Sequence, residues 1–317
     1  MYYDRDDNID NINVPDKFVE ITTLLRLHQK NIRKKIVKMI YKSFDEDCED
    51  SKKQIMDIIE YAIFSGGKHY RSFFVELLGR MFNLNLAKTL FVGAIIEMVH
   101  HYIIMQNAMP EFENNDYRHN RESCHKKFGN AQTIIASNAL YSLIMEIITD
   151  DKSVNFSNEI RCQLVKIIAK ASGKDGVIGG QMMKLISKTQ KTRQDEEVRI
   201  NKLKMHSLFQ AGAECIMLIS GVSDKQDKYV KEYINNLCNL ISIYDNIYLD
   251  NEDSNLLMAR AKLLCNQGVK NAKKIENSDL LIDFIEYNYY CINQLYEKQK
   301  NNKPIVVSND KNEHLNV

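Results

Sequence analysis

The sequence predicts an all-α protein, and three observations carry that prediction. Apolar residues recur every three or four positions in one stretch after another, as they do on the buried face of a helix. The 317 residues include only three prolines and twelve glycines, too few for the many turns of an all-β fold. No alternating strand pattern, internal repeat or dividing linker occurs. We therefore expect one domain of about ten helices over 16–300, between disordered tails at 1–15 and 301–317.

The first part of the chain gives helical segments in order. Apolar residues from Phe18 to Leu27 keep helical spacing and run into a basic stretch at 30–38, which fits one or two helices. An amphipathic segment at 52–64 stops at a glycine pair, and a segment at 68–82 has a basic start and an apolar body. The segment at 86–109 is apolar almost throughout, which is typical of a helix buried on most sides.

The later segments continue the same pattern. A second strongly apolar helix is expected at 130–148, and the helical spacing continues through 154–183. The charged segment at 184–204 is expected to form a loop before a helix. Further amphipathic helices are predicted at 206–221, 228–250, 255–274 and 280–300.

Composition excludes several classes of function. The formal net charge of +1 gives no overall reason to expect a nucleic acid or a membrane surface as partner. The seven cysteines form no C-x-x-C pair, so reduced thiols in the cytoplasm are expected rather than a disulfide framework or zinc site. The acidic N-terminus argues against a targeting signal. No apolar run reaches the ~18 residues that a membrane span needs, so we expect no membrane insertion.

Two local patterns point to anion binding. Lys68 and Arg71 lie three residues apart just after the glycine pair at 66–67, so they share a face near a helix N-terminus, where backbone N–H groups also favour anions. The pattern also fits a helix stop followed by two solvated charges. Further on, the apolar helix at 86–109 breaks at Pro110 into a polar, charged segment, which is typical of the mouth of a cavity for a polar ligand.

The segment 97–129 identifies a family. It reads EMVHHYIIMQNAMPEFENNDYRHNRESCHKKFG and resembles, without a gap, the first aspartate-rich segment of the isoprenyl (polyprenyl) diphosphate synthases, most closely the bacterial farnesyl type. The resemblance extends from about 52 to 295. It implies a single helical bundle around a central cavity, usually dimeric. It also implies head-to-tail transfer between prenyl diphosphates, with Mg²⁺ held by aspartates on two facing helices.

The metal-binding positions of the family are largely changed in this chain. Where the family's first motif has two aspartates this chain has Asn107 and Ala108, and Glu113 stands at the third position. In the second motif Asp245 matches, whereas Asn246 and Leu249 replace carboxylates. Asp250 lies one residue further on, about 100° around the helix, so it replaces the lost aspartate only if the helix shifts locally. Glu113 and Asp245 are the remnant metal ligands that the resemblance implies.

The diphosphate-binding positions are better kept. The resemblance implies that Lys68 and Arg71, together with His100, Arg118, Gln181 and Lys204, contact diphosphate. His100 on an apolar helix fits a core residue equally well. The family's aspartate three residues after Gln181 is Lys184 here, and the lysine-bearing segment after the second motif is absent. Tyr102 stands where short-chain synthases place an aromatic floor under the growing chain, and it fits the core just as well.

Three functions remain open, and the sequence does not fix whether the protein is an enzyme or name a catalytic residue. Because loss of one preorganised electrostatic group costs ~10²–10³ in rate, we favour an impaired homologue that binds prenyl diphosphate or partners an active synthase. The alternatives are a divergent, active, Mg²⁺-dependent short-chain synthase and a ligand-free helical interaction protein. The expected ligand is isopentenyl or allylic diphosphate, the cofactor Mg²⁺ or none, and the assembly a homodimer or a heterodimer.

Overall fold

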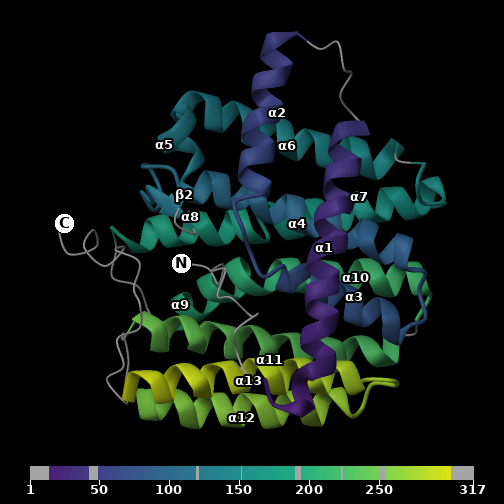
Figure 1. Cartoon of the computed structure of the whole chain (residues 1–317), viewed down its shortest axis with the longest axis vertical. Coiled ribbons are helices and arrows are strands. Elements are labelled where there is room, and N and C mark those ends of the chain that lie inside the picture. Colours follow the sequence, from purple (N-terminus) through teal and green to yellow (C-terminus); the bar gives the residue numbers. More distant parts are fainter. Residues whose placement is uncertain are drawn as a thin grey trace. The chain divides into compact units, whose positions relative to one another are not determined.

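The computed structural model describes residues 14–42, 49–118, 121–150, 152–189, 194–222, 224–249 and 254–300. The tails expected at either end therefore lie largely outside the described residues. Helices account for nearly all regular structure in these ranges, as the sequence predicts (Figure 1). The elements are η2 (Asp16–Phe18), α1 (Val19–Lys42), α2 (Asp50–Ile63), α3 (Tyr70–Met81), α4 (Leu86–Asn107), β1 (Tyr117–Arg118), β2 (Arg121–Glu122), α5 (Cys124–Phe128), α6 (Asn130–Asp150), α7 (Asn158–Ser172), α8 (Val177–Ser187), α9 (Gln194–Asn201), the π-helix η3 (Lys202–His206), α10 (Ser207–Ser220), α11 (Asp224–Leu249), α12 (Ser254–Ala272) and α13 (Asp279–Lys300).

Local chemistry explains where several helices begin and end. The Asn85 side chain accepts a hydrogen bond from Ala87 N at 2.7 Å and so caps α4. Ser157 caps α7 in the same way through Ile160 N. Gly221, with φ of 66°, ends α10 in the left-handed conformation that favours glycine.

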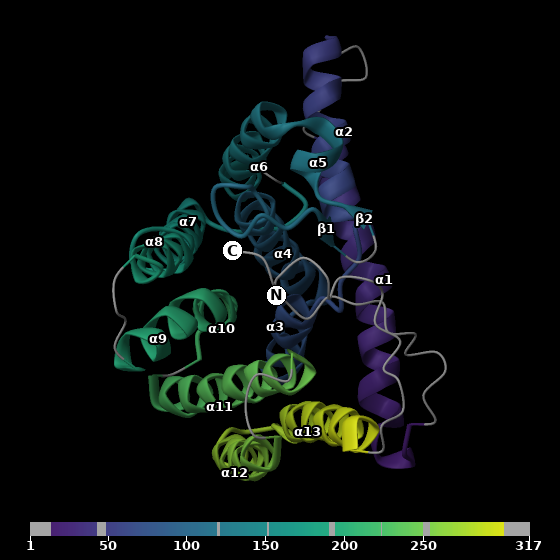
Figure 2. The ribbon, with the colours of Figure 1, turned by 90° about the vertical axis from the view of Figure 1, so that its left-hand side faces the viewer.

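Contacts between Cα atoms divide the chain into two compact units. Among the described residues, the first comprises those within 14–22, 121 and 225–300, and the second comprises those within 23–118 and 122–224. In the first unit, α12 packs along α13, and both Figure 1 and Figure 2 show these helices beside α11. Gly268 on α12 permits this packing, because a Cβ there would lie 2.1 Å from Ile285 Cδ1. The Phe18 ring packs on Tyr287 and Tyr290 of α13.

The second unit is built around α4. This helix packs against α3, α6 and α10, and most of its residues are buried, which explains why its composition is apolar on every side. Small residues bring the neighbours close: a Cβ at Gly79 of α3 would lie 2.5 Å from Thr89 Oγ1 of α4. α4 and α6 are each long and apolar enough to cross a membrane by composition, but 89% of the apolar window of α4 is buried inside the protein, against 44% for α6.

Two expectations about individual segments are wrong. The helical pattern at 154–183 is broken, because α7 ends at Ser172 and α8 begins at Val177. A Cβ on Gly176 would lie 1.8 Å from the Ala171 carbonyl oxygen, so the tight turn needs glycine there. The segment at 184–204 is largely helical, since α8 extends to Ser187 and α9 covers Gln194–Asn201. These breaks and the short α5 raise the number of α-helices in the described ranges to thirteen, above the ten expected.

Candidate functional site

The loop after α4 folds back on the end of that helix. Glu113 N donates to Asn107 O at 3.1 Å, and Asn115 N donates to Ala108 O at 3.1 Å. Asn114 reverses the chain with a φ of 49°, a left-handed conformation that asparagine tolerates better than most residues. The loop therefore brings Glu113 next to Asn107 and Ala108, the three positions of the first motif.

Two lysines bind the carboxylate of Glu113. Lys184 Nζ of α8 and Lys204 Nζ of η3 each lie 3.1 Å from the same oxygen, Glu113 Oε1. The side chain of Lys204 is 5% exposed and that of Glu113 is 13% exposed, whereas that of Lys184 is 38% exposed. The carboxylate therefore sits between one buried ammonium group and one that reaches solvent.

The surroundings of Glu113 and Lys204 lower the pKa values of both groups. Burial raises the pKa of Glu113, but the Lys204 and Lys184 ammonium groups outweigh burial and hold it at about 2. Burial lowers the pKa of Lys204, the Glu113 carboxylate opposes that effect, and the Lys184 ammonium adds to it. Two ammonium groups thus share one carboxylate. The three side chains therefore carry a formal excess of one positive charge.

A glycine contact places the two lysines. A Cβ on Gly180 of α8 would lie 2.8 Å from Leu203 Cβ and 3.1 Å from Lys204 Cγ, so α8 approaches η3 this closely only with glycine at 180. Lys184 follows one turn later on α8 and reaches the same carboxylate. Gln181, expected to contact diphosphate, is buried on α8, and its Oε1 has no hydrogen-bond partner among the described residues.

The basic turn before α3 is a second group of cations. Gly66 and Gly67 have φ of 113° and 129°, and His69 has φ of 53°, so the chain turns sharply into α3. Lys68 is buried, and the Arg71 guanidinium lies over the Phe209 ring at 5.5 Å. Arg71 is close enough to His100 to lower its pKa, so the structure brings these two expected ligands together. Arg118 is half-buried in β1, and its place in the diphosphate site stays a prediction.

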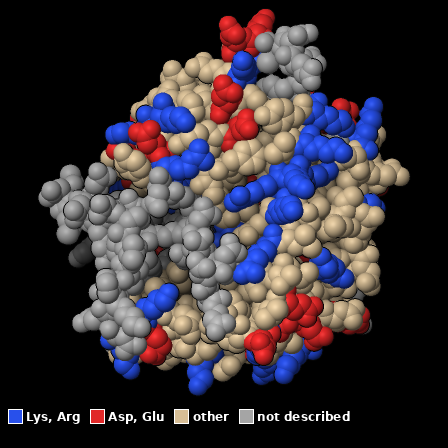
Figure 3. Space-filling view, in the orientation of Figure 1, with Lys and Arg blue, Asp and Glu red and all other residues tan. Residues whose placement is uncertain are grey.

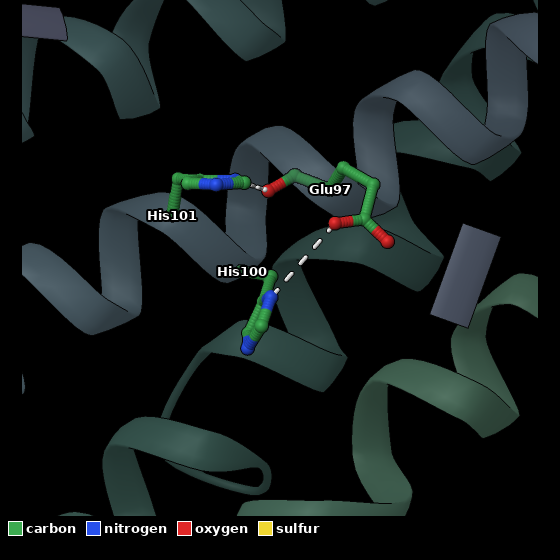
Figure 4. A group of neighbouring side chains, drawn as sticks. All are labelled: Glu97, His100 and His101. Carbon is green, nitrogen blue, oxygen red and sulfur yellow. Dashed lines mark hydrogen bonds and ion pairs between the residues drawn. The ribbon is translucent and has the colours of Figure 1, made fainter. Parts of the chain in front are cut away.

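A buried carboxylate orders the histidines next to Arg71. Glu97 accepts hydrogen bonds from Ser72 N and His69 Nδ1, each at 3.1 Å, and His100 Nδ1 lies 3.9 Å from the same carboxylate. Figure 4 shows that His101 instead turns to the backbone of this helix, where its Nδ1 donates to the Glu97 carbonyl oxygen at 2.7 Å. The sequence interpretation missed Glu97, His69 and His101. The spacing of three residues between Glu97 and His100 was a signal for this contact.

This histidine cluster forms a hydrogen-bond network rather than a metal centre. One ligand atom from each of Glu97, His100 and His101 lies within 4.8 Å of the others. However, the carboxylate already binds the Ser72 amide and His69, and the Nδ1 of His101 faces a backbone carbonyl. The network therefore fixes His100 beside Arg71.

A Ser–His–Glu chain of hydrogen bonds lies deeper in the same region. His28 Nε2 lies 2.8 Å from Ser72 Oγ, and His28 Nδ1 lies 2.6 Å from Glu76 Oε2. This order of groups is that of a hydrolase triad, yet Ser72 is completely buried, so no substrate reaches it. Ser72 Oγ also lies 3.0 Å from the His69 carbonyl oxygen. This series of hydrogen bonds is a structural support for the turn into α3.

Burial of His100 predicts a pH-dependent stability. Burial and the nearby Arg71 lower the pKa of His100 from 6.5 to about 4, so between these values the unfolded chain binds more protons than the folded one. The free energy of unfolding is expected to fall as the pH drops from 6.5 to 4, by roughly 3 kcal/mol from His100 at most. Urea denaturation at pH 7 and pH 4.5 measures this fall, and His100→Asn should reduce it. An unchanged fall in that variant would contradict the assignment.

Comparison with known proteins decides the family. The polyprenyl synthetase family model matches residues 52–255, more than half of the chain. The chain belongs to the polyprenyl synthetase family. Farnesyl diphosphate synthase of Escherichia coli is 29% identical over 182 residues, 56% of this chain and 61% of that protein. That of Geobacillus stearothermophilus is 26% identical over 217 residues, 68% of this chain and 73% of that protein. The match thus spans about three fifths of the length of the Escherichia coli relative.

A solved structure extends the likeness to the fold. An FPP/GFPP synthase from Zymomonas mobilis superposes with a TM-score of 0.77 at 24% identity, covering 85% of this chain and 98% of that one. At this identity the likeness concerns the fold. The resemblance stated from the sequence is therefore confirmed for the family and for the all-α fold.

The first motif of this polyprenyl synthetase does not fit Mg²⁺. That ion prefers several oxygen ligands in octahedral geometry. Ala108 offers no side-chain oxygen, Asn107 offers at most a neutral one, and the Oε1 of Glu113 is shared by two ammonium groups. A divalent cation beside that oxygen would be repelled by both lysines. The Lys184 and Lys204 ammonium groups thus lie beside Glu113, where a divalent cation would have to bind.

The second motif and the chain-length position are less fully described. Asp245, Asn246 and Leu249 lie on α11, but the side chains of Asp245 and Leu249 lie outside the described residues, as does Asp250. Their role as metal ligands stays a prediction. Tyr102 is 7% exposed and its ring packs on Tyr141 of α6 at 4.8 Å between centroids, so its environment is that of a core residue. A floor under a prenyl chain stays a prediction.

Proposed function

We propose that this polyprenyl synthetase is a catalytically impaired homologue of isoprenoid biosynthesis that binds a prenyl diphosphate. The observation that supports it best is the contact of Lys184 and Lys204 with Glu113. Prenyl transfer needs divalent cations to neutralise the departing diphosphate, and the one carboxylate left in the first motif is already neutralised by side chains. Slow or absent transfer is the expected consequence.

The basic residues support retention of ligand binding. Lys68 and Arg71 stand at the turn into α3, and the Glu97 network holds His100 close to Arg71. Because His100 is mainly neutral at pH 7, it contributes a hydrogen bond rather than a charge. The two side-chain cations supply the electrostatic attraction to a diphosphate, with the bidentate guanidinium adding geometric preference.

Calorimetric titration with isopentenyl diphosphate tests this binding function. Lys68→Ala and Arg71→Ala are each expected to weaken binding by on the order of 10-fold, as loss of a charge-assisted hydrogen bond does. Lys53→Ala, an exposed lysine on α2, is the matched control and should bind as the unchanged protein does. If all three variants bind equally well, the turn before α3 is not the site. If the unchanged protein binds no diphosphate, the remaining functions are those without a ligand, namely a partner of an active synthase and a ligand-free scaffold.

A second candidate function, as partner of an active synthase, is favoured by the outer face of α8. Ile178, Met182 and Ile186 follow one another at intervals of four residues and are 43%, 57% and 47% exposed. Such an apolar stripe suits contact with another chain. An aspartate-complete synthase from the same organism is the partner we propose. A change in its rate or product length on adding this protein would support the proposal.

A further inference from the structure

We propose that Lys184 binds a diphosphate directly beside Lys204, so that the site at Glu113 holds its anion without a divalent cation. This inference rests on the diphosphate binding proposed above, for which the family resemblance already implies a Lys204 contact, and adds Lys184 and the absence of a metal requirement. Its basis is the arrangement of three charged side chains from the 107–116 loop, α8 and η3.

Charge and donor capacity favour an anion at this place. An ammonium group has three donors, and Glu113 accepts one from Lys184 through a single oxygen. Because the Lys184 side chain is 38% exposed, its remaining donors can reach a ligand from solvent. Lys188, one turn further along α8, donates to the Phe112 carbonyl oxygen at 2.7 Å and brings a third cation to the same loop. The three lysines together exceed the charge of Glu113 by two.

A polar group without a partner supports a ligand at the same place. Asn107 is buried, and its Nδ2 has no hydrogen-bond partner among the described residues. The backbone carbonyl oxygen of Asn107 accepts a hydrogen bond from Glu113 N, so Asn107 lies at the start of the same loop. A buried polar atom normally has a partner, and this unpartnered NH₂ group suits a phosphate oxygen.

Asp116 and the cations of α1 differ from this site in their surroundings. Asp116, in the same loop, is held by Lys126 at 2.7 Å, so its charge is matched elsewhere. Figure 3 shows a broad band of lysine and arginine side chains on the face that carries α1. The cations of α1 are mostly exposed along an amphipathic helix, the usual arrangement of a solvated face. In contrast, Lys204 is buried at the loop that ends α4.

Titration calorimetry with inorganic pyrophosphate, in EDTA and in Mg²⁺, tests the inference. The dissociation constant should be similar in the two buffers, within about 3-fold. Lys184→Met should weaken binding in EDTA by on the order of 10-fold, and Lys184→Arg, which keeps the charge, should retain most of it. Lys202→Met is the matched control, because this exposed lysine lies two residues before Lys204, and it should bind normally. Thermal unfolding of each variant checks that the fold is kept.

A third substitution, which restores a carboxylate at position 184, tests whether the lysine takes the place of a metal ion. Lys184→Asp places a second carboxylate beside Glu113, so pyrophosphate binding should become dependent on Mg²⁺. Binding by the unchanged protein only in Mg²⁺ would overturn the inference. Equal binding by Lys184→Met in EDTA would also overturn it, and Lys68→Ala and Arg71→Ala would then show whether the proposed function stands alone. Absence of pyrophosphate binding in both buffers would overturn the inference, while the isopentenyl diphosphate titration decides the proposed function separately.

Discussion

Purified protein incubated with dimethylallyl and isopentenyl diphosphates and Mg²⁺ is expected to yield no chain-extended product. Removing one preorganised electrostatic group costs ~10²–10³ in rate, and the first motif has lost two carboxylates at positions 107 and 108. Its third, Glu113, is bound to Lys184 and Lys204. Because such effects are not additive, we expect a rate at least about 10³-fold below that of an intact synthase rather than the product of the separate losses.

The assay needs a positive control and a partner arm. Escherichia coli farnesyl diphosphate synthase, assayed in parallel, establishes that substrates and metal are competent. Repeating the assay with an aspartate-complete synthase of the same organism separates an inert protein from a partner that changes the rate or product length. Clear turnover by the protein alone would refute impairment and favour a divergent active synthase.

Glu113→Leu is expected to lower the free energy of unfolding at pH 7 by roughly 3 kcal/mol. The substitution leaves the buried ammonium group of Lys204 without its carboxylate, and an uncompensated buried charge typically costs about 3–5 kcal/mol. Lys184 is more exposed and is hydrated instead, so it adds less. Chemical denaturation measures the loss. Glu111→Leu, an exposed glutamate in the same loop, is the matched control and should change stability by no more than about 0.5 kcal/mol.

The double variant and the pH dependence sharpen this test. Glu113→Leu combined with Lys204→Met removes both buried charges and should recover much of the loss, because an ion pair replaced by apolar groups is often nearly neutral. Glu113 has a folded pKa of about 2 against an ordinary value of 4.5. Its contribution is therefore complete above pH 4.5 and is lost as the pH falls towards 2. A Glu113→Leu effect no larger than that of Glu111→Leu would mean that Lys204 is not held by this carboxylate.

Residue pattern predicted the helices well and their interruptions poorly. Apolar spacing depends on one buried face and is visible in any window of the sequence, so segments such as 86–109 were predicted nearly to the residue. The break between α7 and α8 depends on a carbonyl oxygen of Ala171 occupying the space of a Cβ at Gly176. A glycine in a helical pattern does not by itself disclose such a contact.

The candidate site, like the fold, was predicted only in part from the sequence. Sequence alone determined the family, the all-α fold and the loss of carboxylates at Asn107 and Ala108, because these follow from residue identity and spacing, whereas the diphosphate ligands stay a prediction. It also showed that Lys184 replaces an aspartate, but not where that lysine goes. Only the tertiary structure decided that Lys184 and Lys204 meet at Glu113, 71 and 91 residues away along the chain. That contact requires three segments to converge through the close approach at Gly180, and no local pattern encodes such a distance.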